Sequence, residues 1–246
     1  MVAADAARRG RGRAVTRRDR GDDAAARFDR ERVRRIRRDY GTWAPVYDWF
    51  ARATASVGGV RAACVEALDL ASGDTVVEFG CGPGVNLPAL REAVGPDGHV
   101  VGVDLARPML DRARRLAERR GWANVSLVQA DATDPPIAAA DGILATFVTS
   151  LFPDPGAVVR RWCALADTVV VANFAPRGGR LANAALWAFA RLNTRLFDVT
   201  AADPLAQLDE RTAASRQALA DQMATVESET YLLGTIAVHA GTEASA

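Results

Sequence analysis

The feature that most constrains the fold of this chain is a regular alternation of short apolar segments and amphipathic segments between residues 75 and 173. The apolar segments are five or six residues long and rich in valine, as buried strands are. We expect strands at residues 75–79, 99–104, 125–129, 142–147 and 168–173, and helices at 86–94, 107–120 and 156–165. Strands and helices that alternate with short connections are typical of parallel β-α-β units. The sequence therefore predicts an α/β fold with a doubly wound, mostly parallel sheet.

Composition and charge indicate a globular body with a basic extension. No apolar run approaches the ~18 residues that a membrane span requires, and 49% hydrophobic with 25% charged residues is typical of a soluble protein. All 31 basic residues are arginine; residues 1–38 contain 14 of them against 6 acidic residues, whereas residues 39–246 contain 17 against 24. We expect residues 1–38 to be a disordered extension, and contact with nucleic acid or with an anionic membrane surface is the alternative.

The cysteines and the N-terminal residues indicate in which compartment the protein is expected. Cys64, Cys81 and Cys163 are odd in number and too widely spaced for a metal knuckle, so we expect reduced thiols and no metal site. The first 40 residues contain arginines but no apolar core of the kind that a secretory signal needs. The expected location is therefore the cytoplasm.

The segment "VVEFGCGPGVNLPAL", residues 76–90, predicts a ligand-binding turn after the first strand. Gly80, Gly82 and Gly84 allow positive φ and a close approach of the backbone to a ligand, toward which the free amides of the next helix point. In doubly wound sheets, ligands bind beyond the carboxyl ends of the strands, where the strand order reverses. A pyrophosphate, a ribose or an amino-acid carboxylate would each suit these amides.

Two details of this loop favour a zwitterion over a phosphate. A dinucleotide fingerprint requires G-x-G-x-x-G/A, whereas the chain reads G-C-G-P-G-V, with Val85 in the third small position. Glu78 would also repel a pyrophosphate but would accept a hydrogen bond from a ligand ammonium. Both details argue against a nicotinamide-dependent oxidoreductase.

Four segments together resemble the motifs of the class I S-adenosylmethionine-dependent methyltransferases. "VVEFGCGPG" resembles the first motif, "HVVGVDLARPML" the second and "VQADATDPP" the third, while "DGILATFVTSLFPDP" falls where similar enzymes line the transfer site. The resemblance covers about residues 39–173. It implies S-adenosylmethionine as cofactor and a seven-stranded sheet with an antiparallel last strand. It further implies lid helices over residues 39–70, a cofactor-binding core over 72–173, and a substrate cover with closing strands over 174–246.

The resemblance assigns a role to individual residues. Asp104 would grip both ribose hydroxyls, Asp131 would accept from the adenine amino group, and Ala132 would offer its backbone amide to the ring. The alternatives are that Asp104 is a strand-end cap, that Asp131 makes an Asx turn, and that the glycines only form a tight turn. The side chain of Cys81 is interpreted as structural. The core residues expected at the cofactor are Glu78, Gly80, Cys81, Gly82, Gly84, Asp104, Leu105, Met109, Asp131, Ala132, Thr146 and Phe147.

The segment "YGTWAPVYDWF", residues 40–50, concentrates aromatic residues in a chain with only 7% of them. It resembles the opening of small-molecule and lipid methyltransferases, including the quinone-biosynthesis and phosphatidylethanolamine N-methyltransferase groups, in which this segment folds over the cofactor. We therefore expect Tyr40 and Trp43 at the cofactor, while packing on the sheet is the alternative. Aromatic faces attract a sulfonium and exclude water.

The implied reaction is an in-line displacement that depends on alignment and exclusion of water, with a general base optional. Tyr47 and Asp48 are the candidates for that base. His99 begins the second strand, at the wrong end of the sheet, and His239 lies in the last strand, so both are interpreted as core or surface residues.

The last third of the chain is expected to contact the substrate. Residues 180–199 predict a helix with a broad apolar face, and "YLLGTIAVHAG", residues 231–241, predicts the antiparallel closing strand. A small molecule or a lipid is the expected acceptor, and the alternative for the apolar face of the helix is that it only packs against the sheet. Nucleic acid is not expected, because "ATFV" follows the fourth strand instead of an N-P-P-[YF]-like tetrad. A cofactor-binding protein without transfer activity is the alternative to the enzyme.

Overall fold

The computed structural model describes residues 59–192 and 203–244, all within the compact unit Ile36–Ala246. These residues build a seven-stranded sheet with the order β3-β2-β1-β4-β5-β7-β6. The strands are β1 (Thr75–Phe79), β2 (His99–Asp104), β3 (Val125–Gln129), β4 (Ala140–Thr146), β5 (Ala166–Phe174), β6 (Thr225–Tyr231) and β7 (Ile236–Thr242).

The direction of the strands confirms the predicted fold class. β1 to β5 pair in parallel, whereas β7 runs antiparallel to both β5 and β6. From β1 the chain proceeds outward through β2 to β3 and then returns to add β4 on the other side of β1. The strand order therefore reverses between β1 and β4, which is where ligands of doubly wound sheets bind.

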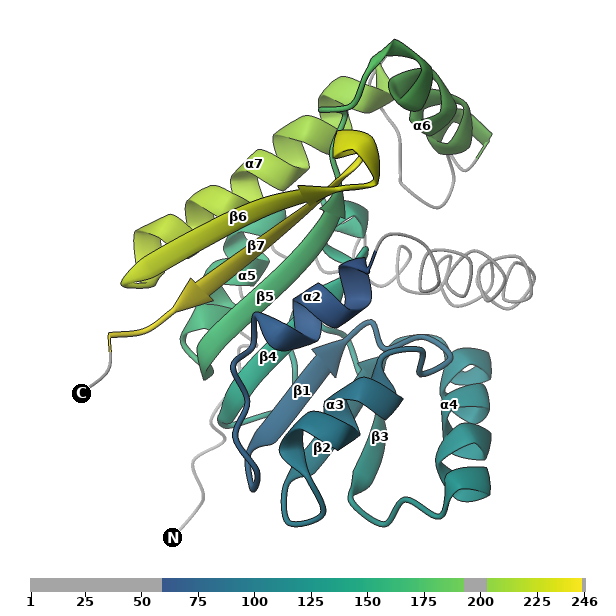
Figure 1. Cartoon of the computed structure of the whole chain (residues 1–246), viewed down its shortest axis with the longest axis vertical. Coiled ribbons are helices and arrows are strands. Elements are labelled where there is room, and N and C mark those ends of the chain that lie inside the picture. Colours follow the sequence, from purple (N-terminus) through teal and green to yellow (C-terminus); the bar gives the residue numbers. More distant parts are fainter. Residues whose placement is uncertain (1–58, 193–202, 245–246) are drawn as a thin grey trace, which may run out of the picture. The chain divides into compact units, whose positions relative to one another are not determined.

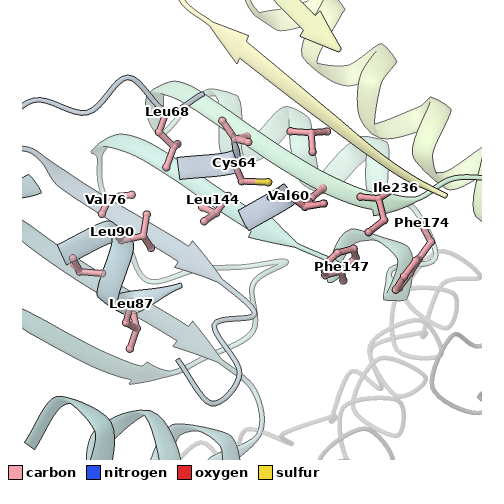
Figure 2. Packing of buried hydrophobic residues seen from close by; sticks show 14 of the residues in the cluster. Val60, Cys64, Leu68, Val76, Leu87, Leu90, Leu144, Phe147, Phe174 and Ile236 are labelled. Atoms are coloured by element: carbon pink, nitrogen blue, oxygen red, sulfur yellow. The ribbon is translucent and has the colours of Figure 1, made fainter. Parts of the chain in front are cut away.

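Helices cover both faces of the sheet because successive strand residues point to opposite sides. Val76 and Leu144 face one core, which includes Cys64 of α2 and Leu90 of α3 (Figure 2). Val77 and its neighbours face a second core with Trp162 of α5 and Leu219 of α7. In Figure 1, α2 and α3 accordingly lie in front of the sheet and α5 and α7 behind it. The helices are α2 (Val60–Glu66), α3 (Leu87–Val94), α4 (Arg107–Arg120), α5 (Pro155–Cys163), α6 (Arg180–Leu192) and α7 (Pro204–Gln222).

Local signals explain where several elements begin. The Asp154 carboxylate accepts a hydrogen bond from the amide of Ala157, and Pro155 follows it at the first helical position, so α5 begins one residue before the expected helix. β4 begins at Ala140, two residues earlier than expected, and β5 extends the expected strand at both ends.

None of the helices in residues 59–192 and 203–244 is both long and apolar enough to cross a membrane.

The C-terminal part differs most from the expected elements. The closing strand is β7, but residues 232–234 before it form a short 3₁₀ turn, η2, rather than strand. Neither β6 nor α7 was located in the sequence. The helix expected over residues 180–199 is present as α6 up to Leu192, and the rest of that range, residues 193–202, lies outside the described residues.

Candidate functional site

The loop between β1 and α3 requires glycine at the positions that the sequence indicated. Gly80, Gly82 and Gly84 have φ of +68°, +54° and +86°, which is the left-handed region that side chains disfavour. A Cβ at Gly84 would lie 2.7 Å from Cδ1 of Leu87, and one at Gly80 would lie 2.8 Å from Cβ of Val148. Positive φ therefore disfavours a side chain at all three positions, and a Cβ at Gly80 or Gly84 would also require Val148 or Leu87 to shift.

Asp104 ends β2 and holds this loop. Its Oδ2 accepts a hydrogen bond from the amide of Gly82 at 2.9 Å, and its Oδ1 accepts one from the amide of Ala106 at 2.7 Å. Burial raises the pKa of Asp104, and the two backbone amides oppose that rise. A carboxylate has about four lone-pair sites, so both oxygens can still accept from a ligand. The expectation of a strand-end cap and that of a ligand-binding acid are thus compatible.

Glu78 lies in β1, beneath the loop, and only 1% of it is exposed. Its Oε1 accepts a hydrogen bond from the Asn86 amide at 2.6 Å, whereas its Oε2 is buried with no hydrogen-bond partner among the described residues. Burial raises the pKa of Glu78 to about 8, against the opposing effects of Asn86 and the Arg61 guanidinium. An orphaned carboxylate oxygen at this point has the chemistry to accept a hydrogen bond from a ligand ammonium.

Arg61 and Asn86 complete a buried polar network that sequence reasoning missed. Asn86 donates to Thr146 Oγ1 at 3.2 Å as well as to Glu78. Arg61 of α2 donates through Nη1 to Asn86 Oδ1 at 2.8 Å and to Thr146 Oγ1 at 3.4 Å. These partners are 25 and 85 residues away in sequence, so no local motif could indicate the pairing.

Thr146 and Phe147 lie where the strand order reverses, at the carboxyl end of β4. Thr146 is 4% exposed and belongs to the polar network. Phe147 has a φ of +62°, a strained conformation for a bulky residue, and it stacks on Phe174 with ring centroids 4.7 Å apart. The Arg61 guanidinium carbon lies 5.8 Å from the centroid of the Phe147 ring. Both expected residues thus border the network.

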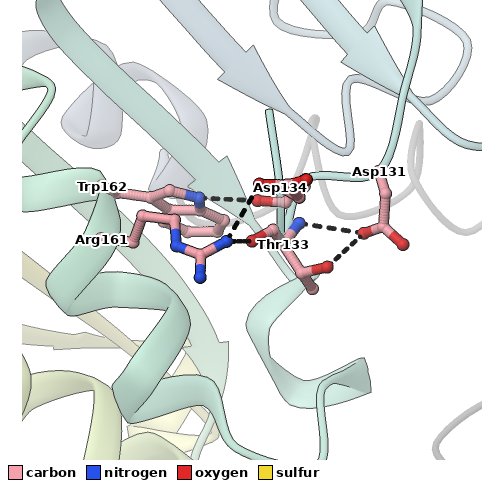
Figure 3. A network of polar contacts seen from close by, with 6 residues as sticks. Asp131, Thr133, Asp134, Arg161 and Trp162 are labelled. Carbon is pink, nitrogen blue, oxygen red and sulfur yellow. Dashed lines mark hydrogen bonds and ion pairs between the residues drawn. The ribbon is translucent and has the colours of Figure 1, made fainter. Parts of the chain in front are cut away.

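Asp131 and Ala132 follow β3 in a turn fixed to α5 (Figure 3). Asp131 Oδ1 accepts from the amide and the hydroxyl of Thr133 at 2.9 and 2.8 Å, which is the Asx turn considered from the sequence. The Ala132 carbonyl accepts from Trp162 Nε1 at 2.8 Å, and the Thr133 carbonyl from Arg161 Nη1 at 2.5 Å. Because Asp131 Oδ1 serves the turn, its Oδ2 is the atom available to a ligand.

The other core residues expected at the cofactor are buried or half-buried. Cys81 is 3% exposed, burial raises the pKa of its thiol well above the ordinary range, and its Sγ lies against the backbone of Gly102. Met109 is 1% exposed in the first turn of α4. Leu105 is half-buried, and its carbonyl accepts from the Gln129 amide at 3.1 Å. The structural interpretation of the Cys81 side chain agrees with its burial.

The four expected residues of the aromatic segment, Tyr40, Trp43, Tyr47 and Asp48, lie outside the described residues. The two histidines lie as expected, away from the network. His239 is buried in β7 with its Nδ1 2.8 Å from Ser228 Oγ, and burial lowers its pKa to about 4. His99 Nε2 lies 2.9 Å from Ser126 Oγ at the start of β2.

Comparison with known proteins finds similarity to methyltransferases over part of the chain. Residues 76–167 match the family of methyltransferase domains. The nocamycin O-methyltransferase of Saccharothrix syringae is 37% identical over 103 residues, which are 41% of this chain and 37% of that protein. The aklanonic acid methyltransferase DauC of Streptomyces sp. (strain C5) is 33% identical over 113 residues, 45% of this chain and 47% of that protein. The chain thus matches less than half the length of either relative.

Solved structures show the same fold. An O-methyltransferase family protein from Burkholderia thailandensis superposes with a TM-score of 0.59 at 15% identity, covering 80% of this chain and 58% of that one. A SAM dependent methyltransferase from Aquifex aeolicus gives a TM-score of 0.54 at 16% identity, covering 75% of this chain and 89% of that one.

Proposed function

We propose that this protein transfers a methyl group from S-adenosylmethionine to a small-molecule acceptor, because residues 76–167 match the family of methyltransferase domains. One observation carries the proposal. Within the matched segment, Asp104 is fixed by the amides of Gly82 and Ala106 beside a three-glycine loop. That position, beside the switch point of the sheet, is where a ribose would be gripped and the backbone can approach a ligand closely.

The described residues fit the cofactor at both of its polar ends. Asp104 has lone pairs left for the two ribose hydroxyls, and the orphaned Oε2 of Glu78 faces no competing partner among the described residues. In this proposal Asp131 and Ala132 receive the adenine. When bound, S-adenosylmethionine supplies a methyl group already activated by its sulfonium, so the chain has to align the acceptor and exclude water. Tyr47 and Asp48 remain the candidates for a general base.

The acceptor in this proposal is an apolar small molecule. Phe147, Phe174 and Phe189 form a row of ring contacts from the site to α6, with successive centroids 4.7 and 5.5 Å apart. Such a row suits an apolar or aromatic body. The relatives named for nocamycin and aklanonic acid support a small-molecule acceptor. The alternative acceptor is a lipid, which the protein would approach through the basic residues 1–38. The proposed location of the protein is the cytoplasm.

Turnover tests this proposal. The purified protein is incubated with S-adenosylmethionine carrying a labelled methyl group and with a panel of apolar hydroxy and carboxy compounds, quinone precursors and lipid extracts. We expect S-adenosylhomocysteine and a labelled product with at least one class. Tight binding of S-adenosylhomocysteine without transfer to any class would favour the alternative, a cofactor-binding protein of the same fold.

A further inference from the structure

Arg61 is a charged residue to which the proposed function assigns no role. It lies in the first turn of α2 and reaches across to the carboxyl ends of β1 and β4. Its Nη1 donates to Asn86 and Thr146, and its guanidinium lies beside the ring of Phe147. Three contacts from two segments, the β1–α3 loop and the end of β4, therefore fix the orientation of this guanidinium.

These contacts leave one donor of Arg61 without a partner. Its Nε is buried and has no hydrogen-bond partner among the described residues. A buried donor that makes no hydrogen bond is unfavourable, and native proteins contain few of them. Nε belongs to the side edge of the guanidinium, whose parallel N–H groups match the two oxygens of a carboxylate. Arg61 therefore offers an anion site that the described residues do not fill.

The side-chain amide of Asn86 links Arg61 to an acid, Glu78, that also has an unpartnered atom. Asn86 accepts from Arg61 through Oδ1 and donates to Glu78 through Nδ2. Glu78 in turn has its own buried, unpartnered oxygen, Oε2, as seen within the described part of the chain. One side chain thus holds a cation and an acid at a fixed separation, and each keeps one unsatisfied atom.

We propose that Arg61 binds the carboxylate of the amino-acid end of the cofactor, while Glu78 binds its ammonium. The inference rests on the proposed function and adds a binding residue to it from α2, outside the segment that matches the family. A receptor with one positive and one negative pole selects a zwitterion, because a phosphate would be attracted by Arg61 but repelled by ionised Glu78. The alternative is that Arg61 only buttresses Asn86 and Thr146.

Ligands that differ by a single group separate these two roles. Calorimetry would give the Kd of S-adenosylmethionine, of decarboxylated S-adenosylmethionine, which lacks only the carboxylate, and of 5′-methylthioadenosine, which lacks the whole amino-acid end. For the wild type we expect the loss of the carboxylate to weaken binding about 10- to 100-fold, as for one or two charge-assisted hydrogen bonds. Arg61→Gln should bind S-adenosylmethionine as weakly as the wild type binds the decarboxylated ligand, and Arg61→Lys should lie between them.

The controls make the result specific to Arg61. 5′-methylthioadenosine should bind Arg61→Gln and the wild type equally, because it has no carboxylate. Arg91→Gln is the matched variant: Arg91 is also half-buried with an unpartnered Nε among the described residues, but it lies in the last turn of α3. It should leave all three affinities unchanged.

Two results would overturn the inference while leaving the proposed function intact. One is equal binding of S-adenosylmethionine and its decarboxylated form by the wild type. The other is an equal loss of all three ligands in Arg61→Gln, which would indicate a buttress. If the wild type binds none of the three, the proposed function fails, and the inference fails with it.

Discussion

Glu78 is the residue whose ionisation depends most on what the site contains. It is 1% exposed, and burial raises its pKa to about 8, so near neutral pH the proton stays on the carboxyl group in the absence of a ligand. A cation bound at Oε2 would favour the ionised form and lower this pKa again. The acid is therefore suited to ligand binding at a cost to the stability of the free protein.

The pH dependence of stability tests this account of Glu78. Below about pH 4.5 the group is protonated in both the folded and the unfolded chain. As the pH rises from there to about 8, only the unfolded chain releases the proton, so stability is lost over this window. In urea unfolding, Glu78→Gln should raise the free energy of unfolding by about 1–3 kcal/mol at pH 8 and should change it little near pH 4.5. An effect of equal size at both pH values would contradict the account.

Individual site residues differed in how far the sequence could predict them. Gly80, Gly82, Gly84 and Asp104 lie within two short segments of the sequence. The glycines have the positive φ expected of the loop, and Asp104 accepts a hydrogen bond from the loop, while its contact with a ligand stays a prediction. Arg61 and Asn86 were missed, because their role arises only when α2 and β4 approach the loop. The aromatic segment of residues 40–50 lies outside the described residues and stays a prediction.

At the scale of elements, the glycine loop fixes how closely α3 and α4 pack. A Cβ at Gly84 would lie 2.7 Å from Leu87 of α3 and 3.2 Å from Ala113 of α4.

The strands from β1 to β5 were predicted within two residues at each end, because each is an apolar run between turn signals. β6, "TVESETY", could not be located, since it is a largely exposed edge strand without apolar alternation.

Replacement of two glycines separates packing from backbone strain. Gly84→Ala should lower the free energy of unfolding by about 2–4 kcal/mol, from positive φ and the clash together, and should weaken cofactor binding. Gly121→Ala is the control, because Gly121 has a similar φ of +65° but no atom within 4 Å of its Cβ position. It should cost only about 1–2 kcal/mol and leave binding unchanged. Chemical unfolding and calorimetry measure both effects, and equal losses in the two variants would refute the packing argument.

At the scale of the whole molecule, the sheet reversal assembles one site from distant parts of the chain. The site residues come from five elements: Arg61 from α2, Glu78 from β1, Asn86 from the β1–α3 loop, Asp104 from β2 and Thr146 from β4. They meet near the switch point because the strand order reverses between β1 and β4. The alternation of strands and helices was sufficient to predict this architecture. In our proposal the identity of the acceptor depends on contacts of α6 and its surroundings, for which the sequence contains no motif.

The most direct test is calorimetric titration with S-adenosylmethionine, S-adenosylhomocysteine and NAD. We expect the wild type to bind both sulfur ligands and not NAD, and Asp104→Ala to bind them about 10- to 100-fold more weakly, the equivalent of one or two charge-assisted hydrogen bonds. Asp111→Ala is the control, since Asp111 pairs with Arg114 on the exposed side of α4. Thermal unfolding would establish that both variants fold. Unchanged affinity in a folded Asp104→Ala variant, or binding of NAD in place of S-adenosylmethionine, would contradict the assignment of this site.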